Sequence, residues 1–274
     1  MAYLRISMIC LALIFFLLIC APLQWMALRM GWPIRLWLPI LFSRTLAGLV
    51  RLKISARGAV VGPQGPRLLA ANHVSWLDIL ALCSVEPICF LAKREVGSWP
   101  MISAFARLQE TVFVDRNRRR SIPGANGALA QRMLKGRCAL LFPEGTTGDG
   151  LTLRKFHSSH FAAARDLLVK ANDVEAVAVQ PVAIRYSSPS AAWFGDASLA
   201  PHLWSVLKGE PIQCDLVFGE PLAYERGTNR KVVASTVASA IAEMLASMAP
   251  AAGGVVAGRS GGPSFEPLAA TAAS

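Results

Sequence analysis

The chain has 274 residues, 54% of them hydrophobic and 16% charged, and its 28 lysines and arginines against 17 carboxylates give a formal charge of +11. This length allows one large globular unit, and the composition is apolar for a protein that is free in water. The charge suits an anionic membrane, a nucleic acid or an acidic protein without choosing between them. The six cysteines lack paired metal-binding spacing, which argues against a zinc-finger type of domain and indicates free thiols in a reducing compartment.

An apolar segment without charge runs from Ile6 to Leu28. As a helix it would extend about 34 Å, which is enough to cross a bilayer. Only Arg5 precedes this segment, whereas five lysines and arginines follow it by Lys53, so the positive-inside rule places the bulk of the protein in the cytoplasm. We therefore expect a bacterial-type inner (cytoplasmic) membrane, with a cleaved signal peptide as the alternative.

The next segment, residues 32–52, mixes tryptophans and arginines into apolar sequence. Pro33 and Pro39 are expected to break it, so the pattern predicts an interfacial helix on an anionic membrane rather than a second span. Residues 1–51 are thus predicted to form a membrane anchor, whether residues 6–28 cross the bilayer or lie in its interface.

Beyond this anchor, short apolar runs alternate with segments of helical length. The runs predicted as strands are residues 67–71, 88–92, 111–114, 138–142, 176–184 and 212–218. The predicted helices are residues 76–85, 96–108, 127–134, 159–169 and 229–248. Apolar strands that alternate with helices predict an α/β fold with a largely parallel sheet flanked by helices. This domain would span residues 52–249, followed by a disordered tail at residues 250–274.

The segment ANHVSWLDI, residues 71–79, follows the first predicted strand and places His73 five residues before Asp78. As plain structure it is a helix start with Ser75 as the N-cap. As chemistry, a loop histidine and an aspartate of the first helical turn can face each other. The carboxylate would then fix the imidazole tautomer and leave the other nitrogen to accept a proton from a hydroxyl. No Gly-x-Ser-x-Gly motif occurs, so we expect that hydroxyl to belong to a substrate.

Three further segments combine a strand end with polar residues. ETVFVDRNRRR reaches Asp115 and Arg116 at the end of a predicted strand, which suits either a solvated basic loop or the binding of phosphate and anionic lipid. LLFPEGTTGDG follows another strand with Glu144 and lacks the Gly-Lys-Ser/Thr ending of a phosphate-binding Walker loop. VQPVAIRY carries Pro181 inside an apolar strand, which predicts a sheet edge or a bulge.

Taken in order, NHVSWLD, VFVDR, FPEGT and VQPVAI resemble the motifs of the glycerolipid acyltransferase family, the relatives of 1-acyl-sn-glycerol-3-phosphate acyltransferase. The resemblance covers about residues 50 to 225. It implies an α/β domain next to N-terminal membrane helices. It also implies transfer of an acyl group from acyl-carrier protein or acyl-CoA to a lysolipid hydroxyl. No cofactor, metal ion, covalent acyl-enzyme or nucleic acid would take part.

The same resemblance implies a role for each matching residue. In this His-x4-Asp motif, His73 would be the general base and Asp78 its orienting partner. Arg116 would bind the anionic head of the acceptor, with Lys93 as a second cation. The acceptor pocket would be shaped by three residues of FPEGT: Glu144, Gly145 and Thr146.

One departure concerns the acceptor. Many family members carry arginine after FPEGT, where this chain has Thr147, so a cation of the presumed phosphate site is missing. The segments NHVSWLDIL, FPEGTTGDG, AWFGDASLAPHLW and FGEPL also look like bacterial lyso-ornithine lipid acyltransferases. Both acceptors stay open, with lysophosphatidate preferred because that reaction is more widespread. A hydrolase and a non-catalytic lipid-binding protein are the competing classes.

Overall fold

The computed structural model describes residues 2–58, 65–98, 100–115, 118 and 120–248. Arg116, predicted to bind the acceptor, and the tail predicted at residues 250–274 lie outside these ranges.

The described residues form one eight-stranded sheet in the order β1-β7-β6-β2-β5-β3-β4, with β8 paired to β6. The strands are β1 (Leu52–Arg57), β2 (Arg67–Ala71), β3 (Ile88–Lys93), β4 (Val112–Val114), β5 (Cys138–Leu141), β6 (Ala176–Tyr186), β7 (Ile212–Phe218) and β8 (Leu222–Glu225). All pairs are parallel except those that β6 makes with β7 and β8. The prediction of a largely parallel α/β sheet is confirmed, although β1 and β8 were not predicted.

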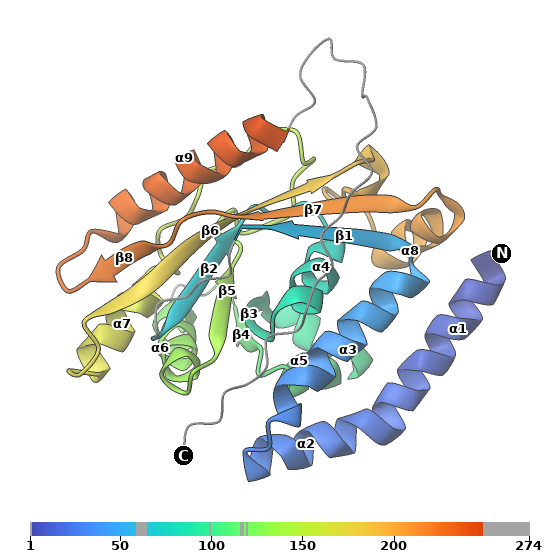
Figure 1. The fold of residues 1–274 in the computed structure, drawn as a ribbon, viewed down its shortest axis with the longest axis horizontal. Coiled ribbons are helices and arrows are strands. Elements are labelled where there is room, and N and C mark those ends of the chain that lie inside the picture. The colour runs from blue at the N-terminus through green and yellow to red at the C-terminus, as the bar shows by residue number, and fades with distance from the viewer. Residues whose placement is uncertain (1, 59–64, 99, 116–117, 119, 249–274) are drawn as a thin grey trace.

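Helices cover both faces of the sheet. They are α1 (Ala2–Phe15), the π-helical turn η1 (Phe16–Cys20), α2 (Ala21–Met30), α3 (Ile34–Leu49), α4 (Leu77–Val85), η2 (Arg94–Ser98), α5 (Pro100–Leu108), α6 (Ser121–Leu134), α7 (Ala162–Lys170), η3 (Pro189–Ala191), α8 (Leu199–Lys208) and α9 (Arg230–Met248). One core contains buried residues of α6, α7 and α9. The core on the other face contains residues of α1, α3, α4 and α8. In Figure 1, α9 accordingly lies on the opposite side of the sheet from α1, α2 and α3.

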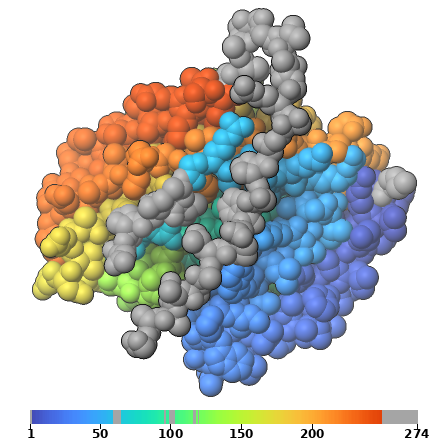
Figure 2. All heavy atoms as spheres, viewed as in Figure 1, coloured from blue at the N-terminus to red at the C-terminus, as the bar shows by residue number. Residues whose placement is uncertain are grey.

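The predicted apolar segment is a continuous helical rod made of α1, η1 and α2. It lies along one side of the molecule together with α3 (blue in Figure 2). Two described helices, Ala2–Met30 and Arg230–Met248, are long and apolar enough to cross a membrane by length and composition. One stripe of the rod is buried against the rest of the protein, and its members are Ile9, Phe16, Cys20, Gln24 and Ala27. The spacing of these residues by three, four or seven positions is that of one helical face.

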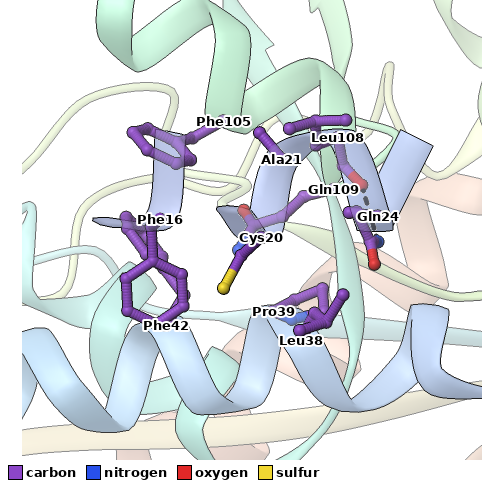
Figure 3. Close-up of a pocket in the computed structure, with 10 residues that line it drawn as sticks. All are labelled: Phe16, Cys20, Ala21, Gln24, Leu38, Pro39, Phe42, Phe105, Leu108 and Gln109. Atoms are coloured by element: carbon purple, nitrogen blue, oxygen red, sulfur yellow. Dashed lines mark hydrogen bonds between the residues drawn. The ribbon is translucent and has the colours of Figure 1, made fainter. Parts of the chain in front are cut away.

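The prediction that Pro39 breaks the following segment is wrong, because α3 continues through it. Proline lacks the N–H that would bond to the carbonyl four residues earlier, which here belongs to Arg35. The Gln24 side chain supplies the missing donor, since its Nε2 lies 3.0 Å from the Arg35 oxygen and 3.1 Å from that of Leu108. Figure 3 shows Gln24 at one end of a small, mostly apolar cavity between η1, α2, α3 and α5. The rod and the domain are thus joined by polar bonds as well as by packing.

Of the two alternatives predicted for Pro181, the sheet edge is wrong, because β6 has neighbours on both sides, and the bulge is confirmed. Pairing of β6 with β8 reaches Val179 opposite Leu222, and pairing with β7 starts at Val182 opposite Phe218, so two residues of β6 face three residues, 219–221. Pro181 therefore lies at this bulge, where its missing N–H interrupts neither ladder. Its carbonyl accepts a hydrogen bond from the Gly219 N–H at 2.9 Å.

Candidate active site

The His-x4-Asp motif lies at the carboxyl end of β2, where the chain turns into α4. This end of a parallel strand is the usual place for ligands in open α/β sheets. The loop is held to the neighbouring strand by Asn72. Its side chain accepts from the Ile184 N–H at 2.7 Å and donates to the Ile184 carbonyl at 2.9 Å. The start of the loop is thereby held against β6.

His73 and Asp78 are in direct contact, with His73 Nδ1 2.7 Å from Asp78 Oδ2. The Asp78 side chain is fully buried, whereas 18% of the His73 side chain is exposed. The same Oδ2 accepts the backbone N–H groups of Val74 at 2.7 Å and Ser75 at 3.0 Å. Amide groups can only donate, so Oδ2 is an acceptor and His73 Nδ1 carries the proton. In the neutral imidazole with this tautomer, the lone pair is on Nε2.

The two interpretations of this segment, a helix start and a catalytic pair, both involve the Asp78 carboxylate. Asp78 accepts the Ser75 N–H, as the third residue of a capping box does. The Ser75 hydroxyl has no partner among the described residues, and the N-cap position belongs to Trp76. Ser75 as the capping side chain is therefore a wrong prediction, because Asp78 accepts the N–H groups of Val74 and Ser75, and backbone carbonyls accept those of Asp78 and Ile79.

Tyr186, at the end of β6, completes the surroundings of Asp78 and was not identified from the sequence. Its hydroxyl donates to Asp78 Oδ1 at 2.7 Å. Burial, reinforced by the Asp78 charge, raises the pKa of Tyr186 well above its usual value, so the hydroxyl keeps its proton and remains a donor. No local signal marks this tyrosine, because it lies 108 residues from Asp78 and the contact depends on β6 lying beside β2.

The FPEGT segment contacts the histidine from the end of β5. The Phe142 ring stacks on the imidazole with 3.9 Å between centroids and 13° between planes. Glu144 accepts the backbone N–H of His73 at 2.7 Å with one oxygen and that of Arg154 at 3.0 Å with the other. Burial raises the pKa of Glu144 above its usual range. Both carboxylate oxygens of Glu144 thus accept hydrogen bonds from loop backbone. The family resemblance had implied only that Glu144 shapes the acceptor pocket.

The remaining predicted residues lie at the same edge of the sheet. Gly145 has a φ of 76°, a left-handed conformation that favours glycine, and the turn leaves the next residue, Thr146, exposed. The turn brings the Gly148 N–H to the His73 carbonyl at 2.8 Å. Lys93 is exposed at the end of β3, and the sheet order places β5 between β3 and β2. The structure therefore brings Asp78 and Glu144 into contact with His73 and puts Lys93 farther along the edge.

A second set of contacts holds the loop from the α8 side. Trp76 Nε1 donates to His202 Nδ1 at 3.0 Å, and His202 Nε2 lies 3.0 Å from the Ala192 carbonyl. Acceptance at Nδ1 requires a neutral imidazole, in agreement with burial lowering the pKa of His202. The backbone N–H of Trp193 also donates to the Val74 carbonyl at 2.9 Å. The segment AWFGDASLAPHLW therefore packs against the His73 loop.

Comparisons with known proteins agree with this architecture. A family model described as Acyltransferase matches residues 53–185. A protein of Rhizobium meliloti (strain 1021) named lyso-ornithine lipid O-acyltransferase is 37% identical over 86% of this chain and 84% of its own length. A Brucella abortus (strain 2308) protein of the same name is 38% identical over 85% and 91%.

Two further relatives carry a different name. A Neisseria gonorrhoeae protein named 1-acyl-sn-glycerol-3-phosphate acyltransferase is 35% identical over 62% of this chain and 67% of its own. The crystal structure of PlsC, the 1-acyl-sn-glycerophosphate acyltransferase of Thermotoga maritima, superposes with a TM-score of 0.54 over 77% of this chain and 78% of that one. At 18% identity this last likeness concerns the fold. Identity over most of their length with named acyltransferases establishes that the chain belongs to the acyltransferase family and is an acyl-transferring enzyme.

Proposed function

We propose that this enzyme is a lyso-ornithine lipid O-acyltransferase. It would move a fatty acyl group from an acyl-carrier protein or CoA thioester to the free hydroxyl of lyso-ornithine lipid. Relatives with that name match over 84% and 91% of their length, against 67% for the Neisseria enzyme named for 1-acyl-sn-glycerol-3-phosphate. Similarity to named relatives is more direct evidence for the acceptor than the abundance of a reaction, which was the reason for preferring lysophosphatidate from the sequence.

The observation that carries the chemical part of the proposal is the hydrogen bond from His73 Nδ1 to the buried Asp78. His73 Nε2 removes the proton of the acceptor hydroxyl, and the oxygen attacks the thioester carbonyl carbon. Asp78 stabilises the resulting imidazolium. The tetrahedral intermediate expels the thiolate, which takes the proton from His73, so one ester forms and one thiol is released. Purified protein given lyso-ornithine lipid and acyl-CoA or acyl-carrier protein should yield ornithine lipid, identified by its mass. Release of free fatty acid alone would instead indicate a hydrolase.

Thr147 offers a test of acceptor choice. It is partly buried in the loop that binds the His73 backbone. Thr147→Arg should raise the kcat/KM ratio for lysophosphatidate over lyso-ornithine lipid, because a guanidinium hydrogen-bonded to phosphate contributes about 1–3 kcal/mol. Leu151→Arg adds the same charge at an exposed position of this loop and should leave the ratio unchanged. An equal ratio in wild type and Thr147→Arg would mean that residue 147 does not face the head group.

Tyr186 is proposed as a positioning residue. Tyr186→Phe removes the only described donor to Asp78 Oδ1, and a buried acceptor left without a partner costs about 1–3 kcal/mol. We expect kcat to fall roughly 10-fold with little change in KM. Tyr224→Phe, at another buried tyrosine, is the matched control and should keep the wild-type kcat. A wild-type kcat in Tyr186→Phe would refute the assigned role.

Membrane attachment through residues 1–51 to the inner membrane, with residues 52–249 in the cytoplasm, also remains a proposal. Its support is the apolar outer surface of the rod and α3, on which large side chains stand exposed, among them Leu4, Leu11, Leu18, Trp25 and Trp37. Each leucine that leaves water contributes about 1.5–3 kcal/mol. The protein should therefore stay in the membrane fraction through an alkaline carbonate wash.

A pair of substitutions tests which surface is responsible. Leu11→Lys combined with Leu18→Lys should shift protein to the soluble fraction. Val169→Lys combined with Val232→Lys changes exposed apolar residues of α7 and α9 and should not. Equal partitioning of the two double variants would exclude the rod as the anchor.

A further inference from the structure

A hollow of about 520 Å³ lies on the α6, α7 and α9 side of the molecule. Its lining brings together polar side chains from α6, from the segment before α7, from α7 itself and from the first residue of α9. The residues that matter are Asn126, His157, Arg165, Asp166 and Arg230. These residues are distinct from those that surround His73.

The charges of this hollow favour an anion. It contains two arginines and one carboxylate, so its formal charge is positive by one. Arg165 is largely exposed and pairs with its neighbour Asp166 at 2.9 Å. Arg230 makes no ion pair within the part of the chain that the structure describes. One guanidinium is thus available for a phosphate, and a second lies on the same wall.

Asn126 adds to the lining of the hollow a hydrogen-bond acceptor that has no partner among the described residues. The residue is 97% buried and donates from Nδ2 to the Ser159 carbonyl at 3.0 Å. Its Oδ1 has no hydrogen-bond partner among the described residues. A buried polar atom without a partner is costly, and a ligand that carries N–H or O–H groups next to its phosphate would satisfy it.

The hollow is connected to the catalytic histidine through a short run of backbone. The His157 N–H donates to the Pro143 carbonyl at 2.8 Å. The residue before Pro143 is Phe142, whose ring stacks on His73 with 3.9 Å between centroids. The contacts of His157, Pro143 and Phe142 thus link the wall of the hollow to the imidazole.

The position of the hollow would also let the two substrates approach from different faces of the sheet. The exposed apolar surface of α1 and α3 lies on the sheet face opposite to α6, α7 and α9. A lysolipid that comes from a membrane on the first face and a water-soluble thioester that comes from the second would meet at the sheet edge that carries His73.

We propose that this hollow binds the phosphate of the pantetheine arm of the acyl donor, the group that CoA and acyl-carrier protein share. The proposal rests on the acyl-transfer function given above and assigns to it a donor site. Arg165 and Arg230 bind the phosphate, and the amide and hydroxyl groups of the arm supply donors to Asn126. The arm then passes His157 and Pro143, which brings the thioester to His73.

The test compares donors with and without the phosphate. The variants are Arg165→Gln, Arg230→Gln and their combination, and Lys231→Gln is the control, because it is an exposed cation of α9 that does not line the hollow. One fatty acyl chain is offered as its CoA, acyl-carrier protein and pantetheine thioesters. In the double variant, KM should rise about tenfold for the first two donors, with kcat unchanged. KM for the pantetheine thioester, which has no phosphate, should match that of the wild type.

Each other outcome contradicts the proposal. No rise in KM for any donor would show that the hollow is not used. An equal rise for the pantetheine thioester would indicate a general disturbance of the enzyme. A rise for the acyl-carrier protein donor alone would assign the arginines to the surface of that acidic protein rather than to the shared phosphate.

Direct binding separates this proposal from the proposed function. Calorimetry with free CoA and with pantetheine needs no acyl transfer. The double variant should bind CoA about tenfold more weakly than wild type and Lys231→Gln do. A wild type that binds CoA but acylates no lysolipid would overturn the function and keep the hollow as an anion site. Equal CoA affinity in wild type and double variant would overturn the hollow alone.

Discussion

Replacement of His73 by alanine should lower kcat by about 10²–10⁴-fold. The imidazole is the group that Asp78 orients, and its Nε2 is the atom left free to take a proton. Loss of the ring would remove the proposed base and leave the Asp78 carboxylate in place, since Asp78 keeps its bonds from the N–H groups of Val74 and Ser75 and from the Tyr186 hydroxyl. The measurement is the initial rate of labelled ester formation with both substrates saturating.

The control for this experiment shows that the His73→Ala variant folds and binds the membrane. Thermal unfolding of His73→Ala should remain a single cooperative transition and membrane fractionation should match the wild type, since the described contacts that are lost are the stacking with Phe142 and the bond to Asp78. A normally folded His73→Ala enzyme with wild-type kcat would remove the basis of the proposed mechanism.

Replacement of Asp78 by asparagine should lower kcat by a similar factor, of the order of 10²–10⁴. In wild type, Oδ2 accepts three donors and Oδ1 accepts one. An amide NH₂ cannot face the N–H groups of Val74 and Ser75, so it must turn toward Tyr186, whose hydroxyl oxygen can accept. His73 then keeps an acceptor for Nδ1 but loses the negative charge that stabilises its protonated form.

The expected signature of Asp78→Asn is a loss in kcat with little change in KM for either substrate, because the substitution acts on the protonated histidine and not on substrate contacts. Asp78→Glu is the companion variant, since it keeps the charge and moves it. A normal kcat in Asp78→Asn would mean that the charge of residue 78 does not take part in catalysis.

Local sequence was enough to predict the pair at the start of α4. His73 and Asp78 are five residues apart, and a strand that ends directly before a helix leaves little freedom in how they face each other. The partners of this pair are distant in sequence, since Tyr186 is 108 residues from Asp78 and Glu144 is 71 residues from His73. Their contacts follow from the order of β2, β5 and β6 in the sheet, which residue patterns do not specify.

The two proline predictions had different outcomes. The break predicted at Pro39 is wrong, because another donor takes the place of the missing N–H, whereas the bulge predicted as one alternative for Pro181 is present. Gln24 satisfies the carbonyl that Pro39 leaves without a donor, and the register shift between β7 and β8 leaves the nitrogen of Pro181 outside both ladders. Tertiary structure decided both cases, and neither effect is visible within a short window of sequence.

The most direct test of the account is a competition between the two acceptors. Membranes that contain the wild-type protein are given equal amounts of lyso-ornithine lipid and lysophosphatidate with a labelled acyl donor, and the labelled products are separated. We predict that labelled ornithine lipid predominates and that the label disappears from it when His73→Ala replaces the wild type. Predominance of labelled phosphatidic acid, or release of the label as free fatty acid, would contradict the proposed function.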